Sequence, residues 1–355
     1  MRKSTIRYCL ISALLALFID FAAIAQEDEI AAEPAIKARL ADQSLLLDAI
    51  KVNDALIAVG ERGHVLISAS GQSWSQANQV PVRSTLTRIT ASGRRLWAVG
   101  HDAAIISSMD GGLTWFVQHF EPEAQEPLLD VVFVDPSRGY AIGAYGRFMS
   151  TRDGGINWQV ERIAERVTSE AIDWAALAGE QDGYETLPDD FEFSDGTDDM
   201  VDKGCFEFLE CHLNAILNYG DGRMMIVAER GYGYRSEDSG QTWESFRFPY
   251  SGSMFGLVRQ NDCIVAFGLR GHAQKSCDFG HSWEGIETGT TQSLMGATVT
   301  DDGRVLMVGS GSTRLVLHPD GRIESDADRM GSDYAAVVIA NGATILVGED
   351  GVRHE

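Results

Sequence analysis

Short apolar runs separated by polar turns fill most of this chain. In the first unit, apolar residues dominate positions 47–50, 56–60 and 64–68, and a more polar stretch follows Trp74. Runs of this length, bounded by Gly, Asp and Ser, predict β-strands. No amphipathic helical period interrupts the pattern before residue 164. The unit therefore predicts four consecutive strands.

The same unit recurs along the sequence. Its second run ends each time in a small residue, the small-residue mark, found at Gly60, Gly100, Gly143, Ala228, Gly268, Gly309 and Gly348. The marks recur about every 40 residues, except that the interval from Gly143 to Ala228 is about double. Four strands in about 40 residues make one blade of a β-propeller. We therefore expect an all-β, seven-bladed β-propeller of four-stranded blades.

The two ends of the repeat array predict how the ring closes. The seventh unit stops after its third strand, residues 351–354, and residues 35–43 precede the first unit without belonging to it. An open ring would leave exposed strand edges. We expect residues 35–43 to supply the fourth strand of blade seven.

A second motif marks the turn between the third and fourth strands. The pattern Ser/Thr-x-Asp-x-Gly-x-Thr/Ser/Asn-Trp occurs four times, and a shorter copy without the Asp ends at Trp74. Asp side chains bond nearby backbone N–H groups in turns, and Trp buries a large apolar surface. Because the motif repeats from blade to blade, we interpret it as structural rather than catalytic. Its aspartates and tryptophans are Asp110, Trp115, Asp153, Trp158, Asp238, Trp243, Asp278 and Trp283.

The amino-terminal residues predict export. Arg2, Lys3 and Arg7 precede an apolar run over residues 8–24, and Ala23-Ile24-Ala25 is an A-x-A cleavage signal. We expect a signal peptide over residues 1–25 and one propeller domain over 26–355. No other apolar stretch approaches the length of a membrane span, so the mature chain is not expected to cross a membrane.

Charge excludes one class of partner and locates an insertion. The formal net charge is −23, which argues against nucleic acid because phosphates require basic patches. Much of the negative charge lies in residues 164–211, which we expect to be an acidic insertion between blades three and four. Its segment 195–199 is either a solvated loop or a Ca²⁺ ligand set without EF-hand spacing. We predict no cofactor and assign no metal site.

Four cysteines follow the signal peptide, and an even count in an oxidising compartment predicts disulfides. Cys263 and Cys277 are equidistant from Arg270, so a hairpin centred there places them on facing strand positions. Cys205 and Cys211 are close enough in sequence to staple a loop. Zinc is the alternative, but no His/Cys set has the spacing of a structural site.

The Trp-ended turns carry a family resemblance. The stretch SMDGGLTW, residues 108–115, is similar to the Asp box, or bacterial neuraminidase repeat. The fuller unit, from Val99-Gly100 to Trp115 and from Ile142-Gly143 to Trp158, resembles the photosystem II stability/assembly factor family. That resemblance implies a seven-bladed propeller without enzymatic activity, exported to a periplasm or thylakoid lumen. It also implies a membrane protein complex as partner, either a photosystem or a transporter of the resistance-nodulation-division type.

Sialidases share the Asp box, so a sialidase-like glycoside hydrolase is the alternative from another class. Sialidases use a Tyr nucleophile, and no Tyr/Glu pair can be assigned here. The F/Y-R-I-P signature that accompanies the first sialidase arginine is absent. The G-x-S-x-G and H-E-x-x-H motifs are absent as well.

One group of residues points to a binding surface. In a four-stranded blade, the turn between strands two and three and the connection to the next blade lie on one face, here called the turn face. The Asp boxes lie on the opposite face, here called the box face. Arg62, Arg147, Arg230 and Arg270 lie at or beside turns of the first kind, so we expect them on the turn face beside the insertion. They either pair locally with residues such as Glu61 and Glu229 or bind an anionic partner.

Together these patterns predict an exported, monomeric, non-enzymatic β-propeller that serves as a binding or assembly platform. We expect it to meet a membrane protein complex through the turn face. The alternatives are an accessory protein of a transporter and the sialidase-like hydrolase.

Overall fold

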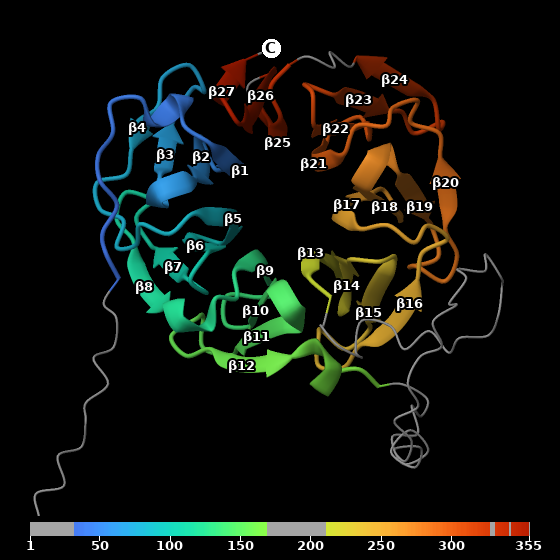
Figure 1. Ribbon diagram of the computed structural model, residues 1–355, viewed down its shortest axis with the longest axis horizontal. Helices are drawn as coiled ribbons and strands as arrows, with labels where there is room; N and C mark the ends of the chain where they lie inside the picture. Colours follow the sequence, from blue (N-terminus) through green and yellow to red (C-terminus); the bar gives the residue numbers. More distant parts are fainter. Residues whose placement is uncertain (1–31, 169–210, 327–330, 341, 355) are drawn as a thin grey trace, which may run out of the picture. The chain divides into compact units, whose positions relative to one another are not determined.

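The computed structural model describes residues 32–168, 211–326, 331–340 and 342–354. Within these ranges the chain forms seven antiparallel sheets, six with four strands and one with three. The sheets surround a central axis as blades, with the first strand of each blade innermost (Figure 1). The seven-bladed β-propeller predicted from the repeat is thereby confirmed.

The strands follow the chain blade by blade. Blades 1 to 3 are β1 (Leu46–Val52), β2 (Ala55–Gly60), β3 (Val65–Ser68), β4 (Ser75–Gln76); β5 (Leu86–Ser92), β6 (Arg95–Gly100), β7 (Ile105–Ser108), β8 (Phe116–His119); and β9 (Leu128–Phe133), β10 (Gly139–Gly143), β11 (Arg147–Thr151), β12 (Gln159–Arg162). Blades 4 and 5 are β13 (Leu213–Gly220), β14 (Arg223–Ala228), β15 (Tyr232–Ser236), β16 (Glu244–Arg247); and β17 (Met254–Gln260), β18 (Cys263–Gly268), β19 (Ala273–Ser276), β20 (Glu284–Ile286). Blades 6 and 7 are β21 (Leu294–Val299), β22 (Val305–Gly309), β23 (Arg314–Leu317), β24 (Ile323–Asp326); and β25 (Tyr334–Ala340), β26 (Ala343–Gly348), β27 (Gly351–His354).

Helical structure in the described ranges is limited to single 3₁₀ turns. These are η1 (Ala41–Gln43), η2 (Glu61–Gly63), η3 (Pro122–Ala124), η4 (Ala144–Gly146), η5 (Ile163–Glu165) and η8 (Leu269–Gly271). No helix in this part of the chain is long and apolar enough to cross a membrane.

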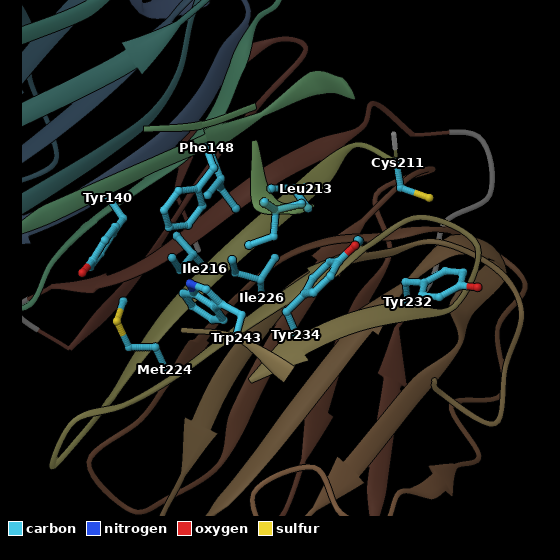
Figure 2. Close-up of a cluster of buried hydrophobic side chains, with 13 residues drawn as sticks. Tyr140, Phe148, Cys211, Leu213, Ile216, Met224, Ile226, Tyr232, Tyr234 and Trp243 are labelled. Atoms are coloured by element: carbon cyan, nitrogen blue, oxygen red, sulfur yellow. The ribbon is translucent and has the colours of Figure 1, made fainter. Parts of the chain in front are cut away.

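The core lies between the blades, because each sheet is apolar on both faces. Figure 2 shows the interface between blades 3 and 4, where Tyr140 and Phe148 meet Trp243 and strand residues of blade 4. The rings of Phe148 and Trp243 lie 6.0 Å apart at 76°, an edge-to-face geometry that aromatic pairs favour. Full burial of each such large apolar side chain stabilises the fold by about 1.5–3 kcal/mol.

The small-residue marks have a steric cause. A Cβ at Gly60 would lie 2.1 Å from the carbonyl oxygen of Leu45, and one at Gly309 would lie 1.9 Å from that of Ser293. Distances this short are forbidden, so in these blades the second strand ends in a residue without a side chain where the chain enters the innermost strand, whereas blade 4 has Ala228 there. The periodic glycines therefore record the close approach of these two segments.

The ring closes differently from the prediction. Residues 35–43 form no strand in blade 7, where β27 is the outermost of three strands. Ala35 instead donates its N–H to Val80 O at 3.0 Å, which places this part of the segment along blade 1. Farther on, η1 lies against the β26–β27 turn, because a Cβ at Gly351 would lie 2.0 Å from Asp42 O.

The segment fills a connection rather than a strand. Asp42 stands four residues before β1, just as Val82 stands four residues before β5. Val82 O also lies against Gly63 in the turn of blade 1, as Asp42 O lies against Gly351 in the turn of blade 7. Residues 41–43 thus occupy the position of a blade-to-blade connection. The ring closes through this contact and through the packing of β25 against β1.

The connection that leaves blade 3 is regular as far as Thr168. The Trp243 N–H donates to Arg166 O at 2.9 Å, and the Thr168 N–H donates to Trp243 O at 2.8 Å. In blade 2, the Trp115 N–H donates in the same way to Gln79 O at 3.0 Å. The rest of the predicted insertion, including Cys205 and segment 195–199, lies outside the described residues, as does the predicted signal peptide over 1–25.

Candidate functional site

The turns between the second and third strands have a fixed shape. Arg62, Arg230 and Arg270 sit at their tips with φ of 55–56°, and each is followed by a glycine that also has positive φ. A Cβ at Gly63 would lie 2.1 Å from Val82 O, and one at Gly271 would lie 2.2 Å from Thr290 O. The turns of Arg62 and Arg270 therefore pack against the connection to the next blade, and this contact places both turns on the turn face, as predicted.

Three of the four predicted arginines are exposed on the turn face. The Arg62 side chain is 76% exposed and lies 4.0 Å from Glu61. Arg230 and Arg270 are also exposed, and neither forms an ion pair with a described residue. They belong to the neighbouring blades 4 and 5, whereas Arg62 lies across the ring on blade 1 (Figure 1). Two of these three exposed arginines therefore lie on adjacent blades, and the third lies on a distant blade.

Arg147 is a correction to the predicted set. Its side chain is only 2% exposed, its Nη1 lies 2.8 Å from Glu126 Oε2, and its Nη2 donates to Glu121. The hydrogen bond from Arg147 is the main cause of the lowered pKa of Glu121. Arg147 begins β11 after the turn and points inward, and Tyr145 occupies the tip of this turn with φ of 55°.

Two pairs of tyrosine and histidine side chains add rings to the turn face. The rings of Tyr145 and His212 meet edge to face at 4.9 Å. The rings of Tyr250 and His272 are stacked at 3.6 Å beside the Arg270 turn. The face around the paired arginines therefore offers flat ring surfaces as well as positive charge.

The Asp boxes form closed hydrogen-bond networks. Asp110 Oδ1 accepts the Ser108 hydroxyl at 2.8 Å and the Thr114 N–H at 2.9 Å, and its Oδ2 accepts the Thr114 hydroxyl. The Trp115 ring N–H donates to Gly112 O at 2.8 Å. The same aspartate contacts recur around Asp153, Asp238 and Asp278.

This geometry supports a structural role for the boxes. The hydrogen bonds from the Asn157 backbone and side chain lower the pKa of Asp153 to about 2, so the carboxylate is an acceptor at neutral pH. Trp115 and Trp243 are fully buried, and Trp158 and Trp283 pack on neighbouring clusters. The shorter copy in blade 1 has no aspartate, but its Trp74 ring N–H still donates to Gly71 O at 2.7 Å.

The predicted cysteine pairing is present in blade 5. Cys263 and Cys277 are joined by a disulfide with a Cα–Cα distance of 4.0 Å, on the facing positions that the hairpin predicts. Cys211 is also disulfide-bonded, and Cys205, the partner expected from spacing, lies outside the described residues. No group of three or more His, Cys, Asp or Glu side chains in the described ranges could hold a metal ion.

The innermost strands line a central channel of about 1230 Å³. Asp48, Arg88 and Asp130 enter it from three consecutive blades. The Arg88 guanidinium lies between the carboxylates, 3.7 Å from Asp48 Oδ1 and 3.2 Å from Asp130 Oδ1. Asp48 Oδ2 accepts the Ile89 N–H at 2.9 Å. Burial outweighs these contacts and raises the pKa of Asp48 to about 6.

Sequence reasoning missed this group, although its signal is visible. Each of the three residues pairs with the residue just before a small-residue mark: Asp48 with Val59, Arg88 with Val99, and Asp130 with Ile142. The equivalent residues in the other blades are all small: Ala215, Gly256, Gly296 and Ala336. At this level the channel is therefore lined by charged residues on the side of blades 1 to 3. On the side of blades 4 to 7 it is lined by small, uncharged residues.

Comparison with known proteins defines the fold and no more. No family model matches the chain, and no curated protein matches it in sequence. Among solved structures, the chain resembles YCF48 from Cyanidioschyzon merolae, with 17% identity and a TM-score of 0.63 over 90% of this chain and 97% of that one. The shared feature is the propeller.

Two further structures show the breadth of this likeness. A structure described as YCF48 bound to D1 peptide matches with 15% identity and a TM-score of 0.62, over 90% of this chain and 98% of that one. The WD40 β-propeller domain of Doa1 matches nearly as well, with 9% identity and a TM-score of 0.61 over 91% and 95%. Propellers of separate sequence families are thus about equally similar in shape.

Proposed function

We propose that this chain is an exported, non-enzymatic binding platform that holds an anionic segment of a membrane protein complex on its turn face. The observation that carries the proposal is the exposed pair Arg230 and Arg270 on adjacent blades, in a chain of net charge −23. Their positive-φ tips are seated on the following connections, so the backbone that presents the two cations is ordered before binding. Preorganisation lowers the entropic cost of association.

The partner class follows from the chemistry of the face. Guanidinium groups bind carboxylates through paired, charge-assisted hydrogen bonds. The neighbouring Tyr250–His272 stack adds an apolar contact for the backbone or side chains of a peptide. One solved structure of similar fold carries a D1 peptide, which supports a peptide as the ligand. An assembly role like that of photosystem II assembly factors is our first assignment, and service to a transporter is the second.

The decisive experiment is capture of the partner from membranes with crosslinking and mass spectrometry. The Arg230→Glu/Arg270→Glu variant should lose capture, because it replaces two cations with two anions. Arg94→Glu/Arg152→Glu is the matched control, since both arginines are exposed and lie on turns of the box face. Capture by wild type should also weaken as salt rises. Equal loss in both double variants would contradict the proposal.

Crosslinked peptides would then separate the two binding assignments by naming a photosystem or a transporter subunit. Turnover of a fluorogenic sialoside would instead support the hydrolase alternative. That alternative rests on the Asp boxes alone, and their carboxylates are engaged in local turn hydrogen bonds.

A further inference from the structure

The Trp of each box fills the interface between its own blade and the preceding one. Trp115 of blade 2 packs among residues of blades 1 and 2. A Cβ on Gly112 in that box would lie 3.3 to 3.7 Å from Ile57, Ile67 and Leu96. These three residues define the seat of the box. Ile57 stands three residues before the small-residue mark of blade 1, and Ile67 stands seven residues after it. Leu96 stands four residues before the mark of blade 2.

The same seat recurs around the ring. In blade 1, the box glycine Gly71 meets Ile345 of blade 7 and Leu56 of its own blade. Gly240 and Gly280 meet Tyr140 and Met225, which are again three residues before the mark of the preceding blade. The position of a box can therefore be located from the marks alone.

Blade 7 has no box in the described residues, and none of those residues fills its seat. Counting from Gly309 and Gly348, the seat is formed by Leu306, Val316 and Thr344. All three line a cavity of about 290 Å³ between blades 6 and 7. Ile57 and Leu96 are fully buried in the filled seat, whereas Leu306 and Thr344 are only partly buried. The cavity is the space that a box Trp occupies elsewhere in the ring.

The strand beside this cavity has an unpaired edge. In blade 4, β15 pairs with β16 from Tyr232↔Arg247 to Arg235↔Glu244. The equivalent residues of blade 7 begin at Val352 and run through β27, which pairs with β26 on one side and with no described strand on the other. Free edge strands present rows of N–H and C=O groups that can accept another strand.

We propose that an extended segment of a partner polypeptide completes blade 7. It pairs antiparallel with β27 and inserts an aromatic side chain into the cavity formed by Leu306, Val316 and Thr344. This site lies at the outer edge of blade 7 and does not depend on the proposed turn-face function.

The chain itself supplies a probe. A synthetic peptide of residues 236–248, SEDSGQTWESFRF, contains the box and fourth strand of blade 4. It should bind the full chain with one-to-one stoichiometry in calorimetry and slow amide hydrogen exchange at Val352–His354. The same peptide with Trp243→Ser should bind at least tenfold more weakly. This comparison requires no change in the protein.

Variants of the chain localise the binding. Val316→Trp, which fills the cavity, should weaken binding at least tenfold, whereas Val160→Trp, an exposed position on blade 3, should not. Arg230→Glu/Arg270→Glu should bind the peptide normally, which separates this site from the turn face. Equal binding of both peptides would overturn the proposal. So would slow exchange without peptide at the β27 amides that face away from β26, or a dimer that Val316→Trp dissociates, since the edge would then already be filled by this chain or by a second copy.

Discussion

The Asp130 carboxylate on blade 3 accepts the backbone N–H of Ile216 on blade 4 at 2.9 Å, although 86 residues separate them along the chain. The bond joins the blade that precedes the acidic segment in the sequence to the blade that follows it. Asp48 makes the equivalent bond from blade 1 to blade 2. With Arg88 between the two carboxylates, the innermost strands of four blades are joined by one charged network.

Arg88→Met should destabilise the fold by about 3 kcal/mol at pH 7, because removing one partner of a buried ion network leaves unpaired charge. The measurement is the free energy of unfolding in urea. Arg94→Met, at an exposed turn, is the control and should change stability by less than about 0.5 kcal/mol. The triple variant Asp48→Asn/Arg88→Met/Asp130→Asn should recover most of the loss. A loss below about 1 kcal/mol for Arg88→Met would contradict the network's importance.

The contribution of Asp48 to stability should rise as the pH falls from 7 to about 4.5. Burial raises the pKa of Asp48 from 3.8 to about 6 and also raises that of Asp130, so the folded state binds more protons than the unfolded state in this window. For Asp48 alone the gain is about 2–3 kcal/mol. Unfolding measured from pH 4.5 to 8 should show a weaker slope in Asp48→Asn. An identical slope in both proteins would refute the shift.

The Asp-box carboxylates contribute to stability with the opposite dependence on pH. Asp153 has its pKa lowered to about 2 by its hydrogen bonds to Asn157, and the pKa of Asp278 is lowered by those from Ser282. Their stabilisation is complete above the unfolded pKa and is lost as pH falls through the folded value. Unfolding measured from pH 4 to pH 2 should therefore show stability that falls with the pH.

Asp110→Ala should lower stability by about 1–2 kcal/mol, because it removes the acceptor for three hydrogen bonds that hold the turn. The denaturation midpoint measures the effect. Blade 1 provides the control, since Ser70 stands where the other boxes have Asp and forms one 3.2 Å bond. Ser70→Ala should cost less than about 0.5 kcal/mol, and a comparable cost at both positions would argue against the aspartate network.

The double variant Cys263→Ser/Cys277→Ser should be less stable by about 2–3 kcal/mol, because the disulfide closes a short loop of 14 residues' separation. Chemical unfolding under oxidising conditions gives the difference. Hydrogen exchange should quicken in β18 and β19 and stay unchanged in blades 2 and 3. Uniform quickening around the ring would mean that the disulfide supports the whole fold rather than its hairpin.

The blade count could be predicted from sequence because two local requirements recur along the chain. A small residue, glycine in every blade except blade 4, stands where the second strand meets the entry of the first, as at Gly60, and in blades 1 to 5 the box turn places its Trp between blades. Both leave residues at fixed intervals. Blade 7 illustrates the limit: residues 35–43 have the right place in the chain to complete it, but Asp42 stands four residues before β1 and so takes the position of a connection.

The candidate sites depended on finer register. Arg62, Arg230 and Arg270 are each two residues past a small-residue mark, whereas Arg147 is four past Gly143 and begins a strand. That difference was readable in the sequence and separates a surface cation from a buried one. The pairing of Arg88 with Asp48 and Asp130 was not readable in this way, because curvature of the ring brings together side chains from strands about 40 residues apart.

The way the chain ends meet bears on how the molecule comes apart. In many β-propellers a sheet built from both chain termini closes the ring. Here no described backbone pairing joins blade 7 to the beginning of the chain, and side-chain packing and one turn contact hold these two parts together. No described residue takes the place of a box Trp between blades 6 and 7, and blade 7 has three described strands where the other blades have four. We therefore expect blade 7 to be the unit of lowest local stability. Under heat or force the propeller should therefore lose its last blade first and remain a six-bladed arc before global unfolding.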